Sequence, residues 1–158
     1  MTEPLSRGVR VRFLATVGAV SLLFANQAPA QAPAGTAVPS SGGAAALEHF
    51  TVRVEGHPMA LWARRPPSPK GAILLIHGRT WSSLPDFDLQ VPAEPRSAMQ
   101  ALAARGYAAY ALDLRGYGGT PRDNTGWITP HRAAADVAEV LKWIAQQEKG
   151  REAPVLLG

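Results

Sequence analysis

Two short segments of this chain combine glycine with side chains that form strong hydrogen bonds, and each follows an apolar run. His77 and Gly78 come directly after the run at residues 72–76. Glycine at this place lets the backbone bend close to a substrate. The second segment, Asp-Leu-Arg-Gly-Tyr-Gly-Gly-Thr at 113–120, follows the run at 107–112. Such segments can hold backbone groups near a substrate or anchor a tight loop.

Five strands are expected to position these segments. Residues 49–54 and 59–64 alternate and predict a hairpin with a turn at 55–58. A proline-rich connection then leads to the continuous apolar runs at 72–76 and 107–112, which suit parallel strands covered on both faces. A short last strand is expected at 155–157.

Two helices are expected between these strands. The first covers residues 95–105, and Gly106 lies where a helix-ending glycine belongs. The second begins at Thr129-Pro130, an N-cap followed by proline, and ends near 149–150. The order predicts an α/β fold, a three-layer α/β/α sandwich with a mostly parallel sheet and a leading β-hairpin. Ligands of such sheets bind at the carboxyl ends of the strands.

The segment at 113–120 has a structural and a functional interpretation. Gly116, Gly118 and Gly119 allow positive φ in a tight loop, and Asp113 and Arg115 can tie that loop down by hydrogen bonds. The alternative is direct contact with substrate, because such loops border pockets. A phosphate-binding loop is excluded, since Pro121 stands where a glycine is needed and no helix begins there.

The end of the chain completes a pattern. Val155-Leu156-Leu157-Gly158 looks like the strand that leads into a G-x-S-x-G nucleophile elbow, with Gly158 as the elbow's first glycine. Together with His77-Gly78 and the D-x-R-G-x-G-x-T segment at 113–120, residues 48–158 resemble the first half of the α/β-hydrolase family. In many members a serine stands where this chain has Thr120.

The resemblance implies a serine hydrolase that cleaves an ester or amide through an acyl-enzyme, without a cofactor. It implies that the backbone N–H of Arg79 is one oxyanion-hole donor. The family's Ser, acid and His follow from the elbow onward, so no catalytic residue is expected in this chain, and hydrolysis is not expected from the chain as given. Esterase, lipase, peptidase, lactonase and dehalogenase chemistry all remain open.

Other polar residues offer weaker alternatives. His49 and His57 precede the central strands, so a surface or turn role is expected for both. His131 lies in the first turn of a helix, and no serine follows it. Asp86 and Asp88 lack further metal ligands nearby, and a solvated loop is expected for both; no metal site is predicted. In the long connection at 79–96, Trp81 and Phe87 either line the pocket or pack over the first helix.

The N-terminal region predicts export. Three arginines, an apolar stretch at 13–24 and Ala28-Pro29-Ala30 form the pattern of a secretory signal over residues 1–30, with cleavage before Gln31. The apolar stretch is short for a membrane span, although an uncleaved anchor is the alternative. Residues 31–46, mostly Ala, Pro, Gly and Ser, predict a disordered linker before a domain at 47–158. A secreted or periplasmic location follows, with membrane contact only during export.

The charge and the cysteine content of the chain limit which partners and which chemistry are expected. The chain has 16 Lys and Arg against 12 Asp and Glu, and half of its net charge of +4 falls in the first 30 residues. Without a basic run, nucleic-acid binding is not expected. The absence of cysteine excludes disulfides and thiolate chemistry. A small-molecule ester or amide is the expected partner; the alternative is a short non-catalytic interaction module or a non-functional fragment.

Overall fold

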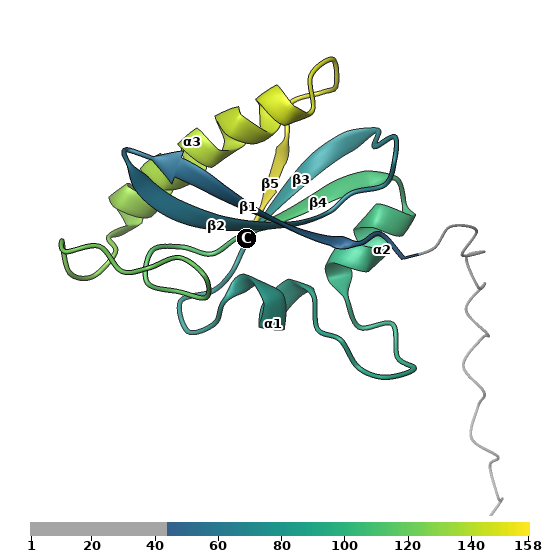
Figure 1. The fold of residues 1–158 in the computed structure, drawn as a ribbon, viewed down its shortest axis with the longest axis horizontal. Helices are drawn as coiled ribbons and strands as arrows, with labels where there is room; N and C mark the ends of the chain where they lie inside the picture. Colours follow the sequence, from purple (N-terminus) through teal and green to yellow (C-terminus); the bar gives the residue numbers. More distant parts are fainter. Residues whose placement is uncertain (1–43) are drawn as a thin grey trace, which may run out of the picture. The chain divides into compact units, whose positions relative to one another are not determined.

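The computed structural model describes residues 44–158 (Figure 1). The predicted signal peptide at 1–30, and the predicted linker up to residue 43, lie outside the described residues. The strands are β1 (Leu47–Val54), β2 (His57–Arg64), β3 (Gly71–Ile76), β4 (Tyr107–Leu112) and β5 (Val155–Leu157). The helices are α1 (Ser83–Phe87), α2 (Ala98–Ala104) and α3 (Pro130–Gln147).

The five strands form one mixed sheet in the order β1-β2-β4-β3-β5. The leading hairpin is antiparallel, and β2 also pairs antiparallel with β4. From there the sheet is parallel, since β3 lies between β4 and β5 and pairs parallel with both. The predicted α/β architecture with a leading hairpin is confirmed.

The hairpin turn is tighter than its sequence suggests. Glu55 and Gly56 have φ values of +50° and +81°, the two consecutive positive values of the turn type that matches strand twist. His57 and Pro58, expected in the turn, belong instead to β2 and pair with Val54 and Arg53. The two-residue turn fixes the register and extends both strands.

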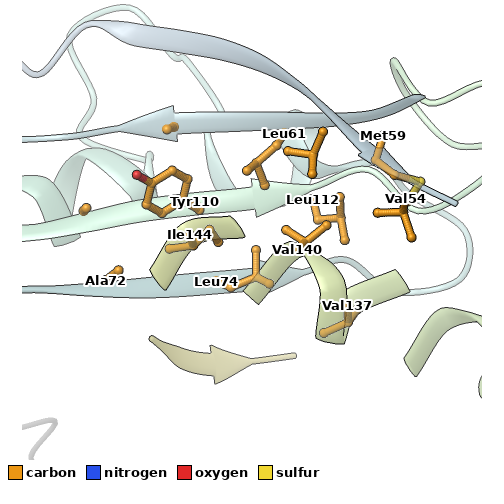
Figure 2. Close-up of a cluster of buried hydrophobic side chains, with 13 residues drawn as sticks. Val54, Met59, Leu61, Ala72, Leu74, Tyr110, Leu112, Val137, Val140 and Ile144 are labelled. Atoms are coloured by element: carbon orange, nitrogen blue, oxygen red, sulfur yellow. The ribbon is translucent and has the colours of Figure 1, made fainter. Parts of the chain in front are cut away.

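One face of the sheet packs on α3 (Figure 2). Leu74 from β3 and Tyr110 and Leu112 from β4 point toward this helix, which presents Val140 and Ile144. These five side chains are fully buried. The i, i+4 spacing on the helix and the alternation along the strands therefore meet in one apolar layer.

The opposite face packs on α2, so the molecule has three layers (Figure 1). Leu75 and Ala109, the sequence neighbours of residues facing α3, meet Met99 of this helix. The alternation explains why β3 and β4 read as continuous apolar runs: successive side chains enter two different cores.

Local signals set the helix ends. Thr129 caps α3 by accepting a 3.2 Å hydrogen bond from the Arg132 N–H, as predicted. Helix α2 begins at Ala98 rather than near residue 95, because Ser97 is its N-cap and accepts from the Gln100 N–H at 2.9 Å. Gly106 ends this helix with a φ of +86°.

Strand β5 lies at the edge of the sheet. Its three residues are at least half exposed, with Val155 the most exposed at 60%. No helix among residues 44–158 is both long and apolar enough to cross a bilayer.

Candidate active site

The sheet brings the two predicted segments to one edge. His77 follows β3, and Asp113 and Leu114 follow the parallel neighbour β4, so both segments leave the sheet at the carboxyl ends of paired strands. A hydrogen bond joins them, from the Leu114 N–H to Nε2 of His77 at 3.0 Å. Gly158 reaches the same place, because a Cβ on it would stand 3.4 Å from that of Ile76, the last residue of β3.

His77 is a buried ring held on both sides. Its Nδ1 lies 2.7 Å from the carbonyl oxygen of Gly78, and its ring centroid lies 5.0 Å from that of Tyr117. Only 4% of the residue is exposed. The ring contacts backbone groups and an aromatic side chain, and no carboxylate of the described residues hydrogen-bonds it.

The residues after His77 are open. Gly78, Arg79 and Thr80 are exposed, and Trp81 is 60% exposed. A Cβ on Gly78 would meet no atom within 4 Å. Among residues 44–158 the backbone N–H of Arg79 donates to no other group. A donor left free at a strand's carboxyl end is available to a ligand.

Asp113 anchors the surroundings of this open segment. Its Oδ1 accepts from the Ser83 N–H at 2.8 Å, and its Oδ2 accepts from the Gly119 N–H and from Nε1 of Trp62, both at 2.9 Å. The residue is 1% exposed. The carboxylate thus ties the start of α1, the glycine loop and β2 together with three charge-assisted hydrogen bonds.

The glycine loop at 116–120 is closed on itself. The Gly116 N–H donates to the carbonyls of Thr120 and Pro121, and the Thr120 N–H donates to Tyr117. Gly118 has a φ of +50°, and a Cβ on it would lie 2.2 Å from Oδ2 of Asp113. These contacts favour the structural interpretation of this segment.

Thr120, the residue in the family's serine position, closes the loop from its other end. Its hydroxyl donates to the Asp113 carbonyl at 2.6 Å and accepts from the Ala60 N–H at 2.8 Å. With 2% exposure, it is a structural hydroxyl.

Arg115 turns away from the open segment and toward α3. Its guanidinium forms a two-pronged ion pair with Asp136 at 2.7 and 2.8 Å and a further one with Asp123 at 3.0 Å. The hydrogen bond with Asp136 is the main reason that the pKa of Arg115 is raised. The side chain is 5% exposed and fixes the loop to the helix.

The long connection at 79–96 is partly ordered, because it contains α1, a short helix that the sequence did not indicate. Phe87 packs against the core under α2, so the packing alternative holds for it. The expectation of a solvated loop is wrong for Asp88, which is 4% exposed and paired with Arg64 through two hydrogen bonds of 2.7 and 2.9 Å. Ser97 also donates to Asp88.

The other three histidines lie outside the segments that follow β3 and β4. His49 is an exposed residue of β1 that stacks on Trp62, with ring centroids 4.3 Å apart. Nε2 of His57 lies 3.0 Å from the carbonyl oxygen of Pro121, and His131 is exposed on α3. Within the part of the chain that the structure describes, no His ring hydrogen-bonds a carboxylate, and no three His, Cys, Asp or Glu gather to hold a metal ion.

Three residues that support the motif residues were not predicted from the sequence. Trp62, Ser83 and Asp136 each bond a motif residue, yet they lie 51, 30 and 21 positions from it along the chain. Asp136 had one local signal, an acid on the helix face that also carries Val137 and Val140. Trp62 and Ser83 had none.

Comparison with known proteins identifies the class. The sequence model described as "Alpha/beta hydrolase family" matches residues 73–158, more than half of the chain. The chain therefore belongs to the alpha/beta hydrolase family. The match covers the last four residues of the strand before His77, the glycine loop and Gly158.

Solved structures agree with this assignment. Epoxide hydrolase VrEH1 from Vigna radiata is 28% identical, with a TM-score of 0.50 over 63% of this chain and 29% of its own. DcsB in complex with its substrate analogue has a TM-score of 0.52 at 15% identity, over 70% of this chain and 35% of its own, which shows the fold alone. The chain thus spans about a third of these relatives or less. No curated protein sequence matches it.

Proposed function

We propose that this chain supplies the oxyanion side of a serine hydrolase that acts on an ester or amide. The observation that carries the proposal is the N–H of Arg79 at the carboxyl end of β3, which donates to no group among residues 44–158. This donor stands in a loop with open space in front of Gly78, and Gly158 lies beside the same strand. In acyl transfer, preorganised N–H donors stabilise the negative charge that develops on the carbonyl oxygen.

The proposed reaction uses a serine two residues beyond Gly158, as the resemblance implies. Its oxygen bonds to the substrate carbonyl carbon, its proton passes to a base, and the carbonyl electron pair moves to the oxygen facing the Arg79 N–H. The tetrahedral species collapses and releases an alcohol or amine that takes the proton. Water then hydrolyses the acyl-serine and yields the carboxylic acid.

Epoxide hydrolysis is the second candidate. The observation that favours it is the 28% identity to epoxide hydrolase VrEH1. Water would open the strained ring to a diol, and an N–H donor at this edge would serve an oxygen that gains negative charge. Both candidates use the same loop, so the substrate separates them.

The test uses the protein encoded by this sequence together with the codons that follow Gly158. Those codons are predicted to read any residue, Ser, any residue, Gly. A p-nitrophenyl ester, an anilide and a styrene oxide are offered in parallel, with and without a serine-directed phosphonate. Ester or anilide turnover that the phosphonate abolishes supports the main proposal.

Diol formation that resists the phosphonate would support the second candidate instead. A stop codon after Gly158, with no turnover of any of these substrates, would contradict both and favour the non-catalytic interaction module. Gly78→Val offers a further check, since a side chain in the open space before the loop is expected to lower kcat by about 100-fold.

We also propose that the protein is exported to the periplasm or beyond the cell. The arginines and the apolar stretch of residues 1–30 support this. N-terminal sequencing of exported material is expected to begin at Gln31. Material that retains Met1 in a membrane fraction would contradict cleavage and favour the anchor.

A further inference from the structure

The candidate oxyanion donor shares one rigid unit with the group that His77 binds. The carbonyl of Gly78 and the N–H of Arg79 belong to the same peptide bond, and the described chain has no cis peptide. In a trans peptide these two groups lie in one plane and point in opposite directions. Whatever fixes the carbonyl therefore aims the N–H.

The hydrogen bonds of His77 determine its tautomer. Leu114 donates its backbone N–H to Nε2 at 3.0 Å, so Nε2 must offer a lone pair. The hydrogen of a neutral ring is then on Nδ1, which lies 2.7 Å from the Gly78 oxygen and donates to it. Both contacts are compatible only with this neutral form.

These bonds run in one direction, from Leu114 N–H through the imidazole to the Gly78 carbonyl and across the peptide to the Arg79 N–H. Hydrogen bonds arranged head to tail polarise one another, and a carbonyl that accepts a bond leaves its own peptide N–H a better donor. The first donor is itself fixed, because Leu114 follows β4 and its carbonyl accepts from the Tyr117 N–H at 2.9 Å. Tyr117 also packs against the imidazole.

We propose that His77 is a positioning residue for the oxyanion hole: its Nδ1–H holds the Gly78–Arg79 peptide so that the Arg79 N–H faces the substrate oxygen. The inference rests on the proposed function of that N–H. It assigns to His77 an effect on the transition state rather than on substrate binding or proton transfer. The ring itself is buried, with 4% of the residue exposed.

Two substitutions of His77 each keep one of the ring's two hydrogen bonds and remove the other. Asn places a side-chain N–H at the same number of bonds from Cβ as Nδ1, so His77→Asn keeps a donor for Gly78 and loses the acceptor for Leu114. Gln places its amide oxygen at the position of Nε2, so His77→Gln keeps the acceptor and loses the donor. Both replacements are polar and smaller than histidine, and thermal melts identify any variant that fails to fold.

The expected kinetic result is asymmetric. In the complete enzyme, His77→Gln is expected to lower kcat by roughly 10- to 100-fold, the scale of one misplaced donor, with KM changed by less than about 3-fold. His77→Asn is expected to stay within about 5-fold of the wild type. Equal kcat for the two variants, or a larger loss in His77→Asn, would overturn the proposal.

The hydrogen bond between His77 and the Gly78 carbonyl can also be tested by a measurement that does not depend on turnover. In the ¹⁵N-labelled chain of 158 residues, nitrogen NMR is expected to show His77 protonated at Nδ1 and bare at Nε2. Both variants lose the ring current of the imidazole, and the Arg79 amide resonance is expected to move further in His77→Gln than in His77→Asn. A proton on Nε2, or an unmoved Arg79 resonance in His77→Gln, would overturn the proposed contact. A wild-type enzyme that is inactive on every substrate would overturn the proposed function alone.

Discussion

The two loops that follow β3 and β4 differ in how many of their backbone N–H groups are hydrogen-bonded within the described residues. In the loop after β4, the N–H groups of Gly116 and Gly119 are bonded within the molecule. In the loop after β3, the N–H of Arg79 is free among the described residues. Both loops carry glycine beside a strand's carboxyl end, yet one uses it to close a scaffold and the other to leave a donor open.

The space around one glycine of each loop differs, and we propose that this separates a structural glycine from one that serves the reaction. Around Gly118 there is no room, since a Cβ there would stand 2.2 Å from Oδ2 of Asp113. Around Gly78 there is nothing within 4 Å of a Cβ. Substituting the first glycine tests folding, and substituting the second tests activity.

The largest effect is expected from Gly118→Ala. The new Cβ meets the buried Asp113 carboxylate at a φ of +50°, where an L residue is also strained. The loss is about 3 kcal/mol, from roughly 1 for the conformation and 2 for the disturbed hydrogen bonds of the carboxylate. Urea unfolding measures it, with Gly78→Ala as the matched control, expected within about 0.5 kcal/mol of the wild type. Equal losses in the two variants would contradict the distinction.

Thr120 and Thr80 allow the same comparison between the closed and the open loop, with a smaller expected loss of stability. Thr120→Val removes the hydroxyl shared by the Ala60 N–H and the Asp113 carbonyl, and leaves two buried backbone groups without partners. The expected cost is about 2 kcal/mol of unfolding free energy. The same change at exposed Thr80, in the open loop, is expected to cost less than about 0.5 kcal/mol. Thr120→Ser keeps the hydroxyl and should recover most of the loss; a Ser variant as unstable as the Val variant would point to packing instead.

The smallest effect concerns acid stability beside the closed loop. Hydrogen bonds from the Thr125 hydroxyl and N–H, and then the Arg115 guanidinium, lower the pKa of Asp123 from 3.8 to about 2. A lowered carboxyl pKa stabilises the fold above the unfolded value, and this contribution is lost as the pH falls from about 4 through 2.

Asp123→Asn removes this pH dependence. The difference in urea midpoint between wild type and Asp123→Asn is expected to shrink on going from about pH 5 to pH 2. Asp86→Asn, at an exposed acid in α1, is the control. A difference that stays constant over this range would show that the ionised form is not what stabilises the loop.

Much of this fold follows from local signals in the sequence. Thr129 and Pro130 mark the start of α3 because capping is decided within a few residues, and Gly106 ends α2 for the same reason. The apolar runs predict buried strands because every residue of a doubly covered strand meets a core. The positions of His77 and Asp113 followed directly from where these runs end.

The supporting contacts could not be predicted in this way. Arg64 and Asp88 are 24 residues apart and meet only once β2 and the connection before α2 are folded. Asp88 therefore looked like a solvated acid in sequence and is a buried ion pair in the structure. Likewise α1 is only 5 residues long, too short for a hydrophobic period to be visible, and Asp113 contributes to holding its first N–H.

The central claim is that the N–H of Arg79 is an oxyanion donor, and one pair of variants tests it most directly. Proline has no backbone N–H, so Arg79→Pro removes the donor, while Arg79→Ala removes only the side chain. In the complete enzyme with an ester substrate, Arg79→Pro is expected to lower kcat by about 100- to 1,000-fold and Arg79→Ala by less than about 5-fold, at unchanged melting temperature. A folded Arg79→Pro enzyme with wild-type kcat, or an Arg79→Ala enzyme equally impaired, would contradict the claim.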